Sequence, residues 1–143
     1  MTTVVYHKPS NTIAYDSRVT AGNVIEADDY DKMIECDRGH KWFVSGCLHD
    51  NEWFVNSFSE HEESEHDLDV YAIVVIDGKV YEAYIHEGHY KLCRLTYSSA
   101  IGSGRYWAIA ALDQGKKAKD AIKYAATRDS STGGKIREYK LRG

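Results

Sequence analysis

The chain has 143 residues, 43% of them hydrophobic and 28% charged, and is long enough for one domain with a substantial core. Its formal net charge of −4 excludes the overall basic field expected of a protein that binds nucleic acid or an anionic membrane surface. We therefore expect a single domain spanning residues 1–143, with neither nucleic acid nor a membrane as its partner.

The first half of the chain predicts short strands and one helix. Three apolar segments predict strands, at residues 2–6, 12–15 and 41–46. Pro9 and Asn11 suit a turn between the first two strands, and an acidic cluster within residues 24–35 precedes the third. Residues 48–66 predict one helix, because their apolar residues fall roughly on one stripe with acidic residues opposite.

The second half predicts a hairpin, further strands and two helices. Residues 71–85 form the clearest hairpin, because Asp77-Gly78 supplies a positive-φ turn between β-branched and aromatic residues. Further strands are predicted at 90–95, at 98–104 and after Gly133-Gly134, and helices at roughly 104–114 and 117–128. Runs of strands with helices grouped between them favour an α+β fold of antiparallel sheets covered by helices.

Thr2 stands directly behind Met1, where a hydroxyl residue has a chemical option that an internal one lacks. A neutral threonine hydroxyl is a weak nucleophile and needs an adjacent base. Once Met1 is removed, which the small side chain of Thr2 permits, the α-amine of Thr2 can serve as that base, since its pKa lies near 7.7–8.0. The simpler alternative is that Thr2 and Thr3 only begin a strand.

Four separated blocks of the sequence resemble the proteasome β-subunit family, including the HslV-type bacterial peptidases, which are N-terminal-nucleophile hydrolases. They occur in the family's order: TTVV, then DSRVTAGN with DKMIE, then WFVSGCLHD, and finally AIGSG with RDSSTGG before a terminal strand. The blocks span nearly the whole chain. The resemblance implies a four-layer αββα sandwich and a threonine peptidase that cleaves peptide bonds through an acyl-enzyme ester.

The resemblance also implies catalytic roles for individual residues. Thr2 would be the nucleophile, with its own amine as the proton shuttle. Lys32 would lie beside the Thr2 hydroxyl, and Asp16 would keep the Lys32 ammonium charged and aimed. A network around the amine would be formed by Ser103, Asp129 and Thr132. Position 132 is threonine where the family usually has serine.

The same carry-over implies residues that bind the substrate. Gly46 would donate its backbone N–H to the oxyanion, although Cys47 replaces the second glycine that usually follows. Residues from Thr20 to Gly22 would pair with the substrate as an added strand. A mainly apolar pocket for the residue before the cleaved bond would be lined by Val19, Tyr30, Val44, Leu48 and Glu52.

Three functional hypotheses remain open from the sequence. The first is an active peptidase in a homo-oligomeric ring, with an ATPase unfoldase as a further candidate partner. The second is a catalytically silent structural ring subunit that retains Met1, and the third is a free-standing amidase acting on a small amide. Taken singly, each site residue also has a structural explanation: Asp16 and Lys32 could form a surface pair, and the glycines could be turns.

Other signals argue against metal, cofactor and disulfide chemistry. HEESEH at 61–66 places its second histidine one residue too late for a zinc-binding HExxH motif, so neither a metal nor another cofactor is expected. The three cysteines are widely spaced without a CxxC pair, which fits a reducing compartment. No apolar signal segment is visible near the start, and we expect a cytoplasmic protein.

Overall fold

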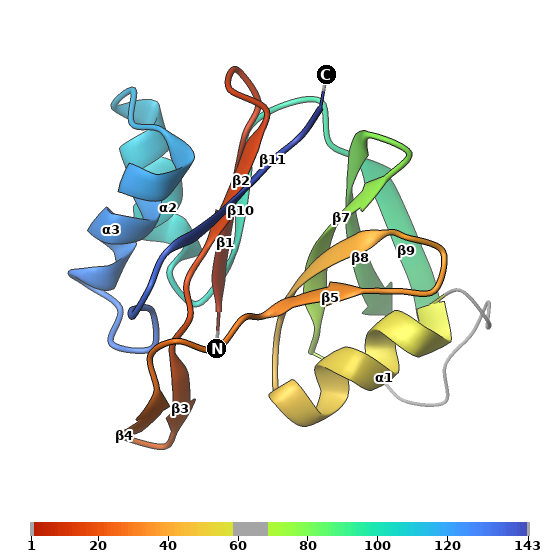
Figure 1. The fold of residues 1–143 in the computed structure, drawn as a ribbon, viewed down its shortest axis with the longest axis horizontal. Coiled ribbons are helices and arrows are strands. Elements are labelled where there is room, and N and C mark those ends of the chain that lie inside the picture. The colour runs from red at the N-terminus through yellow and green to blue at the C-terminus, as the bar shows by residue number, and fades with distance from the viewer. Residues whose placement is uncertain (1, 59–68, 143) are drawn as a thin grey trace.

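The computed structural model describes residues 2–58 and 69–142, shown in Figure 1. Two extended antiparallel sheets, a separate two-stranded hairpin and three helices make up this part of the chain. The strands are β1 (Thr3–His7), β2 (Thr12–Tyr15), β3 (Val19–Ala21), β4 (Val24–Ala27), β5 (Met33–Glu35), β6 (Lys41–Ser45), β7 (Tyr71–Ile76), β8 (Lys79–His86), β9 (His89–Arg94), β10 (Ser99–Gly102) and β11 (Arg137–Lys140). The helices are α1 (Leu48–Phe58), α2 (Arg105–Asp113) and α3 (Ala118–Ala126).

The strand order of the two sheets brings distant parts of the chain together. The first sheet has the order β10-β1-β2-β11, and the second has the order β5-β6-β7-β8-β9. The hairpin of β3 and β4 belongs to neither sheet and projects from one end of the molecule (Figure 1). Every pairing between neighbouring strands is antiparallel.

Alternation of side chains along the strands builds four layers. In β1, Val4 and Tyr6 face the second sheet, whereas Val5 faces the alanine-rich surfaces of α2 and α3. In β6, Phe43 faces the first sheet, whereas Trp42 and Val44 pack against α1. The layers are therefore helix pair, sheet, sheet and single helix (Figure 1), which confirms the predicted αββα sandwich.

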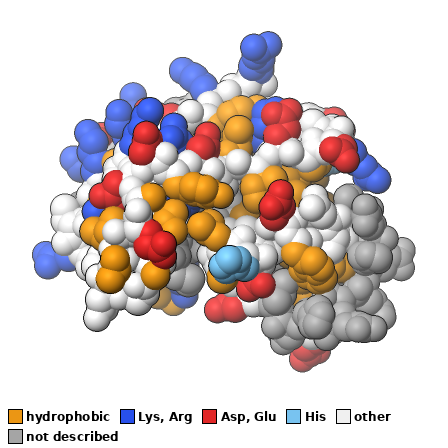
Figure 2. Space-filling model, turned by 60° about the horizontal axis from the view of Figure 1, so that its bottom comes forward, with side chains coloured by type: hydrophobic (Ala, Val, Ile, Leu, Met, Phe, Trp, Pro, Cys, Tyr) orange, Lys and Arg blue, Asp and Glu red, His pale blue; other side chains and the backbone are white. Residues whose placement is uncertain are grey.

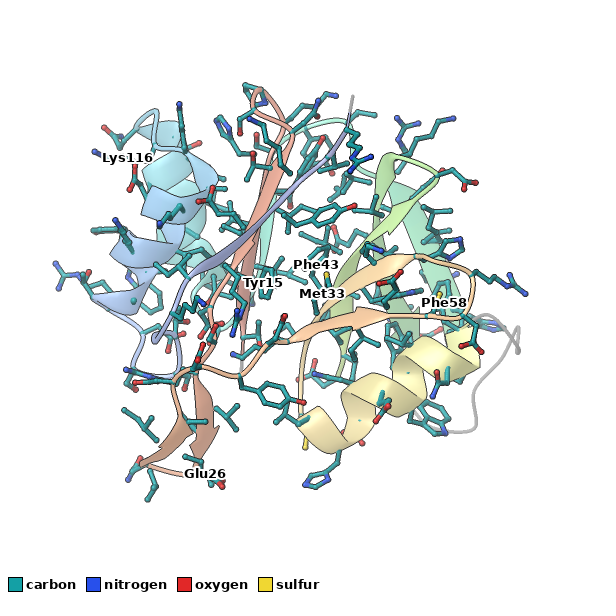
Figure 3. All side chains as sticks on the ribbon, in the orientation of Figure 1. Tyr15, Glu26, Met33, Phe43, Phe58 and Lys116 are labelled. Carbon is teal, nitrogen blue, oxygen red and sulfur yellow. The ribbon has the colours of Figure 1, made fainter. Side chains whose placement is uncertain are left out.

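Aromatic side chains fill the space between the two sheets. The rings of Tyr15 and Phe43 lie 5.1 Å apart between centroids, and Met33 packs against the same cluster. Figure 3 shows these three side chains pointing toward one another from opposite sheets. Aromatic pairs at such distances favour tilted geometry, and the 58° angle between these rings agrees with that preference.

Most predicted elements are confirmed, but three short strands in the first quarter of the chain were not predicted. The predicted hairpin of residues 71–85 is β7 and β8, with Asp77 at φ 50° and Gly78 at φ 76° in the turn. The predicted helix of 48–66 is confirmed as α1 up to Phe58, and its remaining residues lie outside the described part of the chain. The strands β3, β4 and β5 have no counterpart among the predicted elements, because each is only three or four residues long and much of this region is acidic.

Candidate active site

The amino-terminal end of β1 lies where the ends of several other strands meet. Thr3 is opposite Gly102 at the end of β10, and Val4 is opposite Tyr15 at the end of β2. Arg137, the first residue of β11, is also opposite Tyr15, so the loop that precedes β11 reaches the same place. Antiparallel pairing therefore gathers the residues that follow β2 and β10 around the residues that precede β1 and β11.

Asp16 and Lys32 form a buried ion pair at this end of the sandwich. Their side chains are 0% and 2% exposed, and Lys32 Nζ lies 2.9 Å from Asp16 Oδ1. The same oxygen accepts a hydrogen bond from the Thr3 N–H at 3.2 Å, and Asp16 Oδ2 accepts one from the Gly133 N–H at 3.0 Å. Asp16 thus connects Lys32 to the start of β1 and to the loop before β11, and the pair is not a surface ion pair.

Burial affects the protonation of Lys32. It lowers the pKa of the ammonium from its usual value, because a charged group loses its hydration in a protein interior. Attraction and hydrogen bonding to Asp16 oppose this shift without cancelling it. Lys32 is therefore a cation that gives up its proton more readily than an exposed lysine does.

A second network surrounds Asp129, which follows α3. Its Oδ2 accepts hydrogen bonds from Ser103 Oγ at 2.5 Å and from Thr132 Oγ1 at 2.7 Å, and its Oδ1 accepts one from the Ser131 N–H at 3.1 Å. Burial by itself would raise the pKa of Asp129, but these hydrogen bonds outweigh burial and hold that pKa below its usual value. Asp129 is therefore a carboxylate fixed by hydroxyl donors from two separate loops.

Thr3 links the Asp129 network to the strand that begins the chain. Its Oγ1 lies 2.6 Å from Thr132 Oγ1 and accepts a hydrogen bond from the Gly104 N–H at 2.9 Å. Because the Thr132 hydroxyl donates its proton to Asp129, the Thr3 hydroxyl donates to Thr132. Thr3 thus contacts the Asp16 pair through its backbone and the Asp129 network through its side chain.

Thr2 borders an open cavity of about 240 Å³ beside the Asp16 pair. Its carbonyl accepts hydrogen bonds from Ser45 Oγ and from the Ser103 N–H, each at 3.2 Å, which fix the backbone of Thr2. We call this space the Thr2 cavity; the residues that line it are Thr2, Arg18, Val19, Thr20, Ala21, Glu26, Lys32, Gly46, Cys47, Leu48 and His49. Figure 2 brings this end forward and shows hydrophobic side chains gathered there, with acidic side chains among them.

The structure brings some of the predicted substrate-binding residues to this cavity and not others. Val19, Thr20 and Leu48 line it, together with Gly46. Val44 does not, because its fully buried side chain faces α1 and packs near Phe54. Three further positions that the sequence resemblance had associated with substrate lie outside the lining: Gly22, Tyr30 and Glu52.

This chain matches known proteins in its structure and not in its overall sequence. No protein-family model matches the sequence, and no curated protein matches it in sequence. The structure of eukaryotic HslV from Trypanosoma brucei has a TM-score of 0.75 at 16% identity, covering 96% of this chain and 97% of that one. Thiobacillus denitrificans BPH in complex with epoxomicin has a TM-score of 0.74 at 14% identity, with 100% of both chains covered. A second structure of Thiobacillus denitrificans BPH has a TM-score of 0.72 at 15% identity, covering 99% of each chain.

The chain has the HslV fold. The sequence resemblance is thus confirmed at the level of the fold, over nearly the full length of both chains. In this chain Thr2, Asp16 and Lys32 meet at one end of the sandwich. At identities of 14–16% the likeness establishes the fold alone.

Two other kinds of feature are absent from the described part of the chain. Within residues 2–58 and 69–142, no group of three or more His, Cys, Asp or Glu side chains is arranged to hold a metal ion. HEESEH at 61–66 lies outside these residues. None of the three helices seen here has both the length and the apolar character needed to cross a membrane.

Three residues of the site were not singled out by the sequence. Thr3 joins the two networks, Ser45 holds the Thr2 carbonyl, and Arg18 borders the Thr2 cavity while its Nε lies 2.8 Å from Asp28 Oδ1. The threonine pair at the start was a visible signal for Thr3. Ser45 had a weaker one, as a polar residue that ends a strand of apolar residues.

Gly102 packs directly against the backbone of Thr2, and we expect a side chain there to displace it. A Cβ at Gly102 would lie 1.5 Å from the Thr2 carbonyl oxygen, and its φ of +100° disfavours any other residue. Gly102→Ala should therefore destabilise the protein by more than the roughly 1–3 kcal/mol of backbone strain alone, as measured by urea unfolding. Gly115→Ala is the matched control, because Gly115 has φ +84° with nothing within 4 Å of its added Cβ. Equal losses in the two variants would contradict the close approach at Thr2.

Proposed function

We propose that this protein is a threonine peptidase whose nucleophile is the hydroxyl of Thr2, after removal of Met1. The observation that carries the proposal is the position of Asp16, which binds both Lys32 and the Thr3 N–H beside a cavity bordered by Thr2. A buried ion pair of this kind costs desolvation free energy and is weak evidence for a purely structural role. The HslV fold of the chain agrees with the proposal.

The proposed reaction has two acyl-transfer steps. The Thr2 Oγ attacks the carbonyl carbon of the scissile peptide bond, and its proton passes to the neutral α-amine of Thr2. That ammonium then protonates the leaving amine, and the C–N bond breaks to leave an ester on Thr2. Water, deprotonated by the same amine, attacks the ester and releases the acid, which restores the Thr2 hydroxyl.

The surrounding charges favour each proton transfer. The Lys32 ammonium favours the deprotonated Thr2 hydroxyl and disfavours a second positive charge on the amine. The Asp129 carboxylate, held by Ser103 and Thr132, supplies a polar network that orients the amine. Gly46 follows β6 on the wall of the cavity, and its N–H is the proposed donor to the oxyanion.

The proposed substrate is a peptide in an extended conformation. Thr20 and Ala21 on β3 border the Thr2 cavity and offer a strand beside which a peptide could pair. A preference for cleavage after hydrophobic residues is supported by Val19 and Leu48 in the lining, but no longer by Val44. We also propose assembly into a homo-oligomeric ring, which would cover the exposed hydrophobic side chains Tyr106, Trp107 and Ile109 on α2 and Tyr124 on α3.

An intact-mass measurement tests the proposal directly. Protein expressed without an amino-terminal tag should lack the mass of Met1. It should gain one adduct on Thr2 after incubation with epoxomicin, the compound that is in complex with Thiobacillus denitrificans BPH. Peptide mapping then locates the adduct, and native mass spectrometry of the same sample counts the chains in the assembly.

The controls separate the proposed activity from its alternatives. A retained Met1 with no adduct would reject the peptidase in favour of a silent subunit. An adduct on Cys47, which is exposed and also borders the cavity, would reject Thr2 as the reacting group, and the variant Cys47→Ser checks for that outcome. Turnover of a small amide without cleavage of any peptide would favour an amidase.

A further inference from the structure

A second cavity lies next to Thr2 and has a different chemistry from the first. Its volume is about 340 Å³, and we call it the Glu82 cavity; the residues that line it are Ser45, Asp69, Tyr71, Glu82, Ala100, Ile101, Gly102 and Arg105. It shares none of these residues with the Thr2 cavity. The residues around this one space thus include two acidic, one basic, one aromatic and two apolar ones.

The Glu82 cavity reaches the backbone of the proposed nucleophile. Ser45, on its wall, donates a hydrogen bond to the Thr2 carbonyl, and Gly102, also on its wall, packs against the same carbonyl. Thr2 therefore borders the Thr2 cavity itself and contacts two residues that line the Glu82 cavity. A peptide that has one residue in the Thr2 cavity and continues past Thr2 toward Ser45 would enter the Glu82 cavity.

Glu82 occupies a position where the fold would ordinarily place an apolar residue. It lies in β8 opposite Ile73, and its neighbour on the same face of the strand, Val80, belongs to the core between the two sheets. Glu82 is only partly exposed, and burial raises the pKa of its carboxyl. A half-buried carboxylate without a cation costs stability, so its presence on an inner face calls for a functional explanation.

No described cation neutralises the carboxylates of this cavity. Within residues 2–58 and 69–142, neither Glu82 nor Asp69 forms an ion pair or a side-chain hydrogen bond. Arg105 borders the cavity, but its guanidinium is engaged elsewhere: one nitrogen donates to the Gly102 carbonyl at 2.9 Å and another to the Tyr106 hydroxyl at 3.0 Å. Its carbon also lies 4.4 Å from the centroid of the Tyr106 ring. Neither carboxylate of the cavity is therefore held in an ion pair, although the charged Arg105 guanidinium lies on the same wall.

We propose that the Glu82 cavity binds a lysine or arginine side chain of the substrate, on the carboxyl side of the bond that Thr2 cleaves. This inference rests on the proposed function of Thr2. The ammonium or guanidinium would lie between Glu82 and Asp69, where a charge-assisted hydrogen bond is strongest. Its methylene groups would pack on Ala100 and Ile101, and Tyr71, which stacks on Tyr84 at 5.6 Å between ring centroids, offers an aromatic face to the cation.

Matched peptides test the assignment. Three internally quenched peptides differ only in the residue after the cleaved bond, which is arginine, citrulline or glutamate. We expect kcat/KM for the arginine peptide to exceed that for the citrulline peptide by about 10–100-fold, as for one charge-assisted hydrogen bond in a half-buried site. Glu82→Gln should remove most of this ratio by lowering kcat/KM for the arginine peptide. Glu138→Gln removes the same charge at an exposed position of β11, and it should leave the ratio of the two kcat/KM values unchanged.

The outcomes distinguish this inference from the proposed function. Suppose that all three peptides are cleaved at equal rates and that epoxomicin still labels Thr2. This result would overturn the subsite for a cationic side chain and leave the proposed peptidase activity standing. If no peptide is cleaved, binding of the arginine and citrulline peptides to the intact chain is compared by fluorescence anisotropy. Tighter binding of the arginine peptide that Glu82→Gln abolishes would then support the subsite, and equal binding would reject it. Butylammonium that binds as tightly as the arginine peptide would reject a peptide ligand in favour of a small amine.

Discussion

Replacement of Thr2 with alanine should reduce peptide cleavage by roughly 10⁴–10⁶-fold, as expected when the nucleophile of a covalent mechanism is removed. The side chain of Thr2 is buried at the edge of its cavity, and its backbone is held by Ser45 and Ser103. Those contacts use the carbonyl of Thr2 and not its hydroxyl, so the fold should survive the change. Steady-state kinetics on the citrulline peptide measure the loss, and circular dichroism and urea unfolding check the fold.

Thr2→Ser is the matched control for this prediction. Serine keeps the hydroxyl and, like alanine, is small enough to permit removal of Met1, so the amine is generated in both variants. We expect Thr2→Ser to retain measurable cleavage and a single adduct with epoxomicin. Cleavage by Thr2→Ala at the rate of the unsubstituted protein would show that another group, such as Cys47, attacks the peptide bond.

Replacement of Asp16 with alanine should lower the free energy of unfolding by about 3–5 kcal/mol, the usual cost of breaking a buried ion pair from one side. The change removes the carboxylate beside Lys32 and also the acceptor for the Thr3 and Gly133 N–H groups. These three donors belong to separate segments of the chain, so the loss should loosen the site as well as the fold. Urea unfolding gives the free energy, and the extent of epoxomicin labelling reports the site.

A double-mutant cycle and a surface pair serve as controls for this prediction. Asp16→Ala combined with Lys32→Met should be destabilised by less than the sum of the two single variants. The double variant leaves no unpaired buried charge, whereas each single variant leaves one. Glu35→Ala breaks the pair with Lys41, in which the side chains are 54% and 24% exposed, and should cost about 0–1 kcal/mol. A cost for Asp16→Ala as small as that of Glu35→Ala would contradict the buried pair.

The hairpin of β7 and β8 shows why much of the fold was predictable from local pattern. Asp77 and Gly78 adopt positive φ in its turn, and the residues on either side alternate between α1 and the first sheet. The hairpin of β3 and β4 lacks such a pattern, since its strands are short and three of the four residues of β4 are exposed. It is held by tertiary contacts instead: the ion pair of Arg18 with Asp28, and the hydrogen bond from the Lys135 N–H to the Asp28 carbonyl.

Some residues of the candidate site were likewise predictable from the sequence, and others were not. The resemblance of short blocks singled out Thr2, Asp16 and Lys32, and the structure brings them together at one end of the sandwich. Val44 shows the limit of such a transfer, because its position in β6 turns its side chain toward α1 and away from the cavity. Which face a strand residue occupies depends on the register of its neighbours, and a one-residue difference reverses it.

Local periodicity, turn residues and ordered motifs were enough to predict the class of the fold, the order of most elements and a set of candidate residues for acyl transfer. Two further facts came from the tertiary structure alone: the Thr3 hydroxyl joins the Asp129 network, and Glu82 lines a cavity together with Ser45 and Gly102, which contact the Thr2 carbonyl. Both facts depend on the pairing of segments far apart in the chain and on how two sheets face each other. Glu82 and Thr2 are 80 positions apart in the sequence, and it is the packing of β8 against the first sheet that places Glu82 in a cavity with residues that contact the Thr2 carbonyl.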